Sequence, residues 1–172
     1  MKFLSLVALV ISTFSAAAQK TESLPPKIYR WDSIEVKKQN SWVTRSIIEG
    51  STTSLAWFEV MAITLEPGKA SPPSSVYYDL EELVIVREGQ VNSTINSVSK
   101  KLGAGSIAFA MPRMVHAISN AGNTKATYYL LKYKGRLPMD IDRAKRAGGS
   151  FMLDWTELPT SNTGKGYRSD FF

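Results

Sequence analysis

Short apolar or alternating runs, separated by turn residues, follow one another along most of this 172-residue chain. Valine, isoleucine, threonine and aromatic residues are frequent in these runs, as they are in half-buried strands. Turn residues such as Pro67-Gly68 and Glu88-Gly89 separate them. The pattern predicts strands over residues 28–31, 44–49, 54–65, 82–87, 90–98, 106–111, 116–120 and 127–133.

One segment, residues 139–147, has a helical pattern, and Gly148-Gly149 is a typical helix stop. A regular series of short strands without intervening helices favours an antiparallel barrel or sandwich. We therefore predict an all-β fold with a short C-terminal helix. The residues of strand 54–65 alternate between two partly apolar faces, so the pattern does not identify the inner one.

The N-terminal stretch has the organisation of a secretory signal peptide. Lys2 supplies a positive start, a short apolar run follows, and Ala16-Ala17-Ala18 fits a cleavage site. The apolar run is too short to span a bilayer. We predict a signal peptide over residues 1–18 and cleavage near Ala18. The mature protein would then be secreted or periplasmic, without a membrane anchor.

The remaining chain divides into three parts. Residues 19–27 are polar and contain Pro25-Pro26, which indicates an exposed lead-in. Residues 28–137 carry the predicted strands and form the barrel. Residues 138–172 hold the short helix, a strand-like start at 150–155 and then an extended tail or linker.

The chain has no cysteine and one histidine, His116. These counts exclude disulfides, thiolate zinc sites, iron–sulfur clusters, cysteine nucleophiles and metal sites that need several imidazoles from one chain. The net charge is +6, but the lysines and arginines are scattered in short groups. We therefore expect a solvated basic surface and no nucleic-acid partner.

Two segments resemble the paired motifs of the cupin superfamily. In the first, six residues lie between Glu82 and Gly89; in the second, three residues lie between His116 and Asn120, as the cupin pattern expects. The resemblance implies a double-stranded β-helix, the cupin jelly-roll barrel. It also implies a metal ion held by two histidines and a glutamate of the first motif and one histidine of the second.

The chain departs from this pattern where the family has His-x-His. Depending on the register, Ser74 with Val76, Ser75 with Tyr77, or Val76 with Tyr78 fills those places, and none is a histidine. Only Glu82 and His116 remain of four implied ligands. Protein sites for manganese, iron or zinc normally supply at least three ligands. We therefore predict a degenerate site without a metal, with Glu82 and His116 as the only protein ligands if one binds.

Candidate binding residues follow from the implied barrel mouth. A bond between Glu82 and His116 would hold the imidazole in one tautomer, as a general base or a polar anchor for a ligand. The alternative is a half-buried histidine left from an earlier metal site. Tyr77 and Tyr78 could close the pocket or belong to an exposed loop. Arg113 replaces the glycine of the family's Pro-x-Gly and either meets an anionic ligand or lies exposed.

The segments after Asn120, 148–155 and 164–172 look like the N-terminal half and linker of secreted two-cupin proteins similar to (S)-ureidoglycine aminohydrolase. This resemblance implies a manganese enzyme whose metal lies in one barrel. It also implies a continuation of the chain into a second barrel, and pairing as a homodimer or with that barrel.

Two functions remain open. The first is a binding or structural module that takes a small molecule, in which this barrel is the non-catalytic half of a two-cupin assembly. The second is a cupin hydrolase or isomerase that uses Glu82 and His116, with manganese, iron or zinc or as an acid–base pair. The missing histidines favour the first function.

Overall fold

Antiparallel strands make up most of the structure. The computed structural model describes residues 22–72, 76–162 and 167–169. Its elements are η1 (Trp31–Ser33), β1 (Val36–Lys38), β2 (Trp42–Gly50), β3 (Leu55–Leu65), β4 (Glu81–Glu88), β5 (Gln90–Ile95), β6 (Val98–Gly103), β7 (Ile107–Ala110), β8 (His116–Asn120), β9 (Ala126–Gly135), α1 (Ile141–Arg146), β10 (Phe151–Leu153), η2 (Trp155–Glu157), β11 (Thr160–Asn162) and β12 (Tyr167–Ser169). The prediction of an all-β, antiparallel fold with little helix is confirmed.

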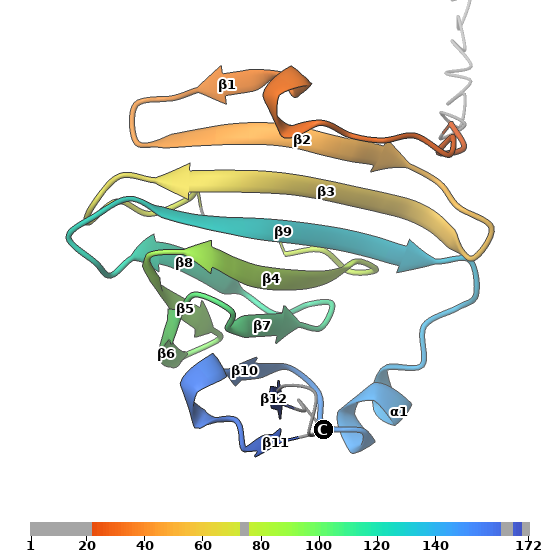
Figure 1. Cartoon of the computed structure of the whole chain (residues 1–172). Helices are drawn as coiled ribbons and strands as arrows, with labels where there is room; N and C mark the ends of the chain where they lie inside the picture. The colour runs from red at the N-terminus through yellow and green to blue at the C-terminus, as the bar shows by residue number, and fades with distance from the viewer. Residues whose placement is uncertain (1–21, 73–75, 163–166, 170–172) are drawn as a thin grey trace, which may run out of the picture.

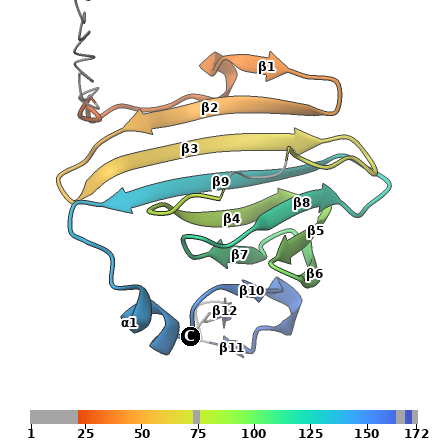
Figure 2. The ribbon, with the colours of Figure 1, turned by 180° about the vertical axis from the view of Figure 1, so that it is seen from behind.

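Two sheets supply the barrel walls. Within the described residues, the larger sheet has the strand order β1-β2-β3-β9-β4-β7-β10, and the smaller has the order β6-β5-β8. The long strands β3 and β9 cross the molecule, and β5, β6 and β8 lie beside β4 and β7 in both views (Figures 1 and 2). A separate hairpin of β11 and β12 lies at the C-terminal end (Figure 1). The chain thus encloses one interior between its two sheets.

The core consists of the inward-facing residues of both sheets. On β4 burial alternates, so that Glu82, Val84 and Val86 are buried, whereas Leu83 and Ile85 between them are only half-buried. Val84 and Val86 belong to one apolar cluster with Tyr128 of β9 from the same sheet and Ile118 of β8 from the other. The alternation that predicted half-buried strands therefore also sets which side chains reach the interior.

The register of β3 identifies its inner face, which the sequence pattern left open. Ile63 of β3 pairs with Tyr128, and Glu59 pairs with Lys132. In an antiparallel pair, directly opposed residues have their side chains on the same face. Tyr128 is fully buried, so Glu59, Met61 and Ile63 face the interior.

Two residues of the sequence motifs, Gly89 and Asn120, stabilise turns of the backbone. Gly89 has a φ of 76°, and a Cβ there would lie 2.6 Å from the carbonyl oxygen of Lys125. The Asn120 side-chain amide donates to the carbonyl oxygens of Leu65 at 3.1 Å and Thr124 at 2.7 Å. Both positions therefore have a structural explanation that is independent of any ligand.

The predicted strand at 28–31 is wrong. Residues 28–30 form no strand, and η1 follows at Trp31. The Trp31 ring lies under the guanidinium groups of Arg45 and Arg87, 4.6 and 4.5 Å from its centre, and meets Tyr129 edge-on. This segment packs across the outer face of the large sheet through its aromatic ring instead of pairing its backbone with an edge.

The other differences concern strand ends and short strands. The segment predicted as one strand at 90–98 holds β5 and the turn at Asn96, which has a φ of 53° and leads into β6. Four short strands were not predicted: β1, β6, β11 and β12. The helix is shorter than predicted, and the Asp140 side chain caps it by accepting from the Arg143 amide at 2.8 Å. The strand-like start at 150–155 corresponds to β10.

The predicted signal peptide, residues 1–18, lies outside the described residues, as do Ser74 and Ser75. Among the residues that are described, no helix is long and apolar enough to cross a membrane. Residues 22–27 lie beside the β2–β3 turn, where the Leu24 amide donates to the carbonyl oxygen of Ser51.

Candidate functional site

His116 and Glu82 form a contact across the barrel interior. His116 is the first residue of β8 in the small sheet, and Glu82 lies on β4 in the large sheet. The imidazole Nδ1 lies 2.9 Å from Glu82 Oε2, and each side chain is only 6% exposed. A carboxylate at Nδ1 favours the tautomer that carries its proton there. The contact thus links the two sheets and fixes the orientation of the imidazole.

A row of charged side chains lies beside this pair on the inner face. Glu59 on β3 pairs in register with Lys132 on β9, and Lys132 pairs with Glu82 on β4. The Lys132 ammonium lies 3.5 Å from Glu59 Oε2 and 3.4 Å from the Tyr77 hydroxyl. Both distances are long for an ammonium that can donate three hydrogen bonds. Lys132 therefore keeps donor capacity for a further acceptor.

The surroundings of Lys132 keep it charged. Burial acts to lower its pKa, but the carboxylate of Glu59, the contact with Tyr77 and the charge of Glu82 together raise the pKa above its ordinary value. Lys132 is thus a cation at neutral pH, even though its side chain is only 15% exposed. The interior of the barrel holds a fixed positive charge.

Tyr128 contributes a neutral hydroxyl. Burial raises its pKa to about 12, a hydrogen bond with Ser71 opposes this shift, and the charge of Glu82 adds to it. The Ser71 hydroxyl also lies 3.2 Å from the carbonyl oxygen of Ile118. Tyr128 therefore stays protonated at neutral pH and supplies the interior with a polar group that carries no charge.

These groups line a pocket of about 210 Å³ between the sheets. One part of its wall is polar, with Tyr77, Glu82, His116 and Lys132. The remaining lining is mostly apolar and aromatic and consists of Trp42, Thr44, Met61, Ile63, Ser71, Pro72, Ile118, Tyr128 and Leu130. An apolar cavity with a few convergent polar groups is the usual form of a small-molecule site.

The structure places the sequence-based candidates differently. Glu82, His116 and Tyr77 line the pocket together. Tyr78 is 72% exposed, and the Arg113 guanidinium lies 5.9 Å above its ring; neither residue lines this pocket. Arg113 has a φ of 67°, in the left-handed region where the family's glycine would be favourable.

Lys132, Glu59 and Tyr128 are site residues that sequence reasoning missed. Lys132 belongs to the predicted strand 127–133, and it shares its face with Tyr128 and Leu130. A charged residue on the apolar face of a strand was the available signal. This signal identifies a site residue only together with the pairing of Lys132 with Glu59 and Glu82, and the sequence alone does not reveal that pairing.

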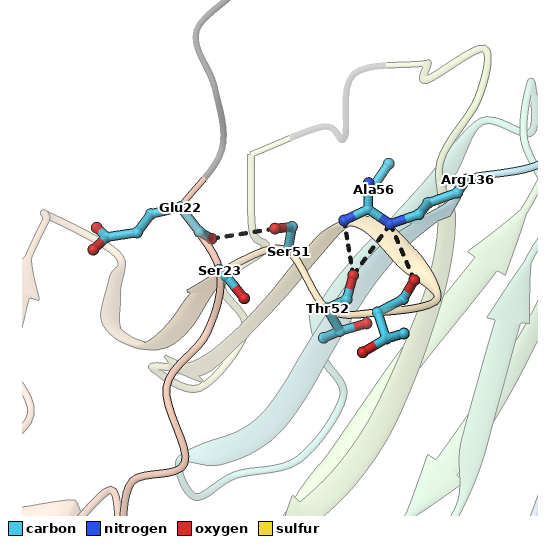
Figure 3. A pocket seen from close by; sticks show the side chains of 7 residues that line it. Glu22, Ser23, Ser51, Thr52, Ala56 and Arg136 are labelled. Carbon is cyan, nitrogen blue, oxygen red and sulfur yellow. Dashed lines mark hydrogen bonds between the residues drawn. The ribbon is translucent and has the colours of Figure 1, made fainter.

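A larger hollow of about 880 Å³ lies at the turn between β2 and β3, and Figure 3 shows the side chains that line it. Arg136 is its one cationic side chain in the described part of the chain. Its guanidinium donates to the carbonyl oxygens of Thr52 and Thr53 at 2.8 to 3.2 Å, as the dashed lines in Figure 3 show. This open hollow has no buried titratable group, so we place the functional site in the smaller pocket.

Comparison with known proteins identifies the fold. Residues 61–132, which include Glu82, His116 and Lys132, match the family model of the cupin domain. The match covers 72 of the 172 residues, and the two-sheet architecture is the cupin jelly roll, as the sequence motifs implied. No curated protein sequence matches the chain significantly.

Similar solved structures support the same fold. Protein YlbA from E. coli superposes with a TM-score of 0.59 at 14% identity, over 75% of this chain and 52% of YlbA. The cupin domain of Cnp3 from Schizosaccharomyces pombe has a TM-score of 0.53 at 16% identity, over 75% of this chain and 83% of that one. Oxalate decarboxylase from Bacillus subtilis has a TM-score of 0.50 at 15% identity, over 62% of this chain and 29% of that one. The chain thus spans about half the length of YlbA, and these likenesses show the fold alone.

The donor set does not fit the metal ion that the cupin pattern implies. Within the described residues, no group of three His, Cys, Asp or Glu side chains could hold a metal. Glu82 and His116 are bonded to each other, and the Lys132 cation faces Glu82 from the neighbouring strand. The positive charge of Lys132 next to Glu82 would repel a metal cation bound there. We therefore derive no chemistry of this site through a metal.

Proposed function

We propose that this chain is a secreted cupin module that binds a small molecule in the barrel pocket through side chains and without a metal ion. The observation that carries this proposal is the convergence of Lys132, Tyr77, Glu82 and His116 on one wall of a largely apolar cavity. Such a combination provides apolar contact area together with oriented hydrogen bonds.

The size of the pocket limits the ligand. A volume of about 210 Å³ is below that of typical drug-sized pockets, which measure about 300 to 1,000 Å³. It corresponds to about seven water molecules at about 30 Å³ each. The ligand is thus a compact molecule, no larger than a single ring with a few further non-hydrogen atoms.

The charges indicate its polar end. The spare donor capacity of Lys132 suits an oxygen acceptor, whereas the carboxylates of Glu59 and Glu82 oppose a strongly anionic ligand. A small molecule with a carbonyl or hydroxyl oxygen at one end and an apolar body satisfies both conditions. The oxygen would meet Lys132 and Tyr77, and the body would contact the side chains around Met61 and Leu130.

Metal analysis and ligand binding test this proposal together. Purified mature protein is expected to carry no stoichiometric manganese, iron or zinc. Small ketones, alcohols and lactones are expected to raise its melting temperature, and Lys132→Met is expected to abolish that rise. Lys134→Met is the matched control, because Lys134 lies two residues away and bonds Asp79 at the surface. A stoichiometric metal that disappears in both Glu82→Ala and His116→Ala would overturn the metal-free proposal.

The second candidate function is a hydrolase or isomerase, similar to (S)-ureidoglycine aminohydrolase, that uses Glu82 and His116 as an acid–base pair. The 2.9 Å contact between the two side chains favours it, because a carboxylate at Nδ1 fixes the tautomer and the orientation of the imidazole, as acid–base catalysis requires. Turnover of a ligand that binds the pocket, lost in His116→Gln while binding remains, would support this function over simple binding.

We also propose that the barrel pairs with a second copy of itself through the outer face of the large sheet. A row of apolar side chains crosses that face: Ile48, Val60, Leu131, Leu83, Phe109 and Phe151. A solvated sheet face normally carries polar residues instead. Light scattering is expected to give a dimer, and Leu83→Lys is expected to give a monomer, whereas Glu88→Lys on the same strand leaves the dimer intact. A monomeric wild-type protein would refute this pairing.

A further inference from the structure

A second, smaller cavity lies behind the contact between Glu82 and His116. Both side chains line it, together with Ser93 of β5 and four apolar residues. Glu82 and His116 therefore separate two spaces, the pocket on one side and this inner cavity on the other. The inner cavity measures about 10 Å³.

Two polar atoms of this lining have no hydrogen-bond partner. Among the described residues, Glu82 Oε1 and Ser93 Oγ are the buried side-chain oxygen or nitrogen atoms that lack one. Ser93 is only 1% exposed, and Glu82 only 5%. Buried polar atoms without a partner are rare and unfavourable, so each one needs an explanation. That both border the same small cavity indicates a shared partner within it.

We propose that one water molecule is bound in this inner cavity, between Glu82 Oε1 and Ser93 Oγ. A cavity of about 10 to 15 Å³ is the smallest that holds a water, and the observed volume meets this limit while it excludes any organic ligand. A carboxylate oxygen only accepts hydrogen bonds, and a hydroxyl can donate and accept. Water can donate to the carboxylate and accept from the serine, and so satisfies both atoms.

The bound water makes Ser93 a positioning residue for His116. The Ser93 hydroxyl then donates to the water, the water donates to Glu82 Oε1, and the imidazole Nδ1 donates to Glu82 Oε2. The carboxylate is held at both oxygens, so it cannot rotate without breaking a bond. This series of hydrogen bonds joins β5, β4 and β8 and orients the imidazole at the pocket wall. It exists whether or not the pocket binds a ligand.

A high-resolution crystal structure of the wild-type chain tests the water directly and needs no variant. The expected result is a single density peak in the cavity, at hydrogen-bond distance from Glu82 Oε1 and Ser93 Oγ. A cavity without density, or a direct bond between Ser93 and Glu82, would overturn the proposal. A peak at about 2.0 to 2.5 Å with several oxygen neighbours would identify a cation and would also overturn it.

The positioning role is tested through the imidazole signals of the protein in solution. Because His116 is the only histidine in the sequence, its nuclear magnetic resonances need no assignment. Ser93→Ala is expected to shift the ring nitrogen and Nδ1-bound proton resonances. Ser99→Ala, at an exposed position of the same hairpin, is expected to leave them unchanged. Ring resonances in Ser93→Ala that coincide with those of the wild type would refute this role.

Discussion

His116 Nδ1 and Glu82 Oε2 join the two sheets of the barrel at a distance of 2.9 Å. The two residues are 34 positions apart by number and come from the two sequence motifs, and the fold alone brings them together. Both side chains are removed from solvent, so the contact is weakly screened and strongly dependent on its geometry.

Removal of the Glu82 carboxylate is therefore expected to destabilise the protein. Glu82→Ala leaves the buried imidazole without its carboxylate, and the breaking of a buried pair costs about 3 kcal/mol. Urea denaturation measures this loss in the free energy of unfolding. Glu88→Ala, at an exposed position of the same strand, is the control and should change stability by less than about 0.5 kcal/mol. Equal stabilities of the two variants would contradict the role of the contact.

Removal of the Lys132 charge is expected to destabilise the protein more than removal of the Lys134 charge. Lys132→Met leaves the half-buried Glu59 without its partner, and we expect a loss of about 1 to 2 kcal/mol. Lys134→Met breaks only an exposed pair with Asp79, for which about 0 to 1 kcal/mol is typical. Thermal unfolding of both variants checks the order, and a larger loss in Lys134→Met would contradict it.

Replacement of Arg113 by glycine is expected to stabilise the protein. Arg113 has a φ of 67°, a conformation that costs a non-glycine residue about 1 kcal/mol or more. Arg113→Gly should remove this strain, although the greater conformational entropy of glycine in the unfolded chain offsets part of the gain in stability. Asn96→Gly is the comparison, because asparagine tolerates its φ of 53° better and should gain less. A less stable Arg113→Gly would show that the contact with Tyr78 outweighs the strain.

Alkaline pH is expected to reduce stability between pH 10 and about 12. Burial raises the pKa of Tyr128 from 10.0 to about 12. Burial and the Glu81 carboxylate raise the pKa of Tyr133 to about 12. Above pH 10 the unfolded chain releases these protons while the folded chain retains them, so the free energy of unfolding falls as the pH rises.

Denaturation at a series of pH values, together with tyrosinate absorbance, measures this effect. Tyr133→Phe is expected to make the decline shallower, because one of the two shifted groups is gone. A stability that stays constant through this range would contradict the shifts.

The sequence predicted the architecture because each strand has its own local pattern. The segment 116–120 matches β8 at both ends, since the alternation of buried and exposed residues there is complete. The short strand β6 was missed because Lys100 and Lys101 conceal its one buried residue, Leu102. Trp31 was assigned to a strand because aromatic residues favour strands, but its ring instead stacks with two arginines that only the folded sheet brings together.

The site was less accessible to sequence reasoning. Glu82 and His116 were found because their spacing matches a motif, and their contact followed from the implied barrel. Lys132 and Glu59 match no motif, and their roles depend on the register of β3, β9 and β4, which long-range pairing decides. Ser93 is one serine among many in the sequence, and only the small cavity beside it makes it notable.

Lys132 also changes what the pocket requires from its surroundings. A positive charge supplied by a metal ion must be captured after folding, and it can be lost to a chelator or exchanged for another ion. The ammonium of Lys132 is part of the chain and stands on a central strand between two carboxylates. This positive charge is therefore present in the pocket as soon as the barrel has folded.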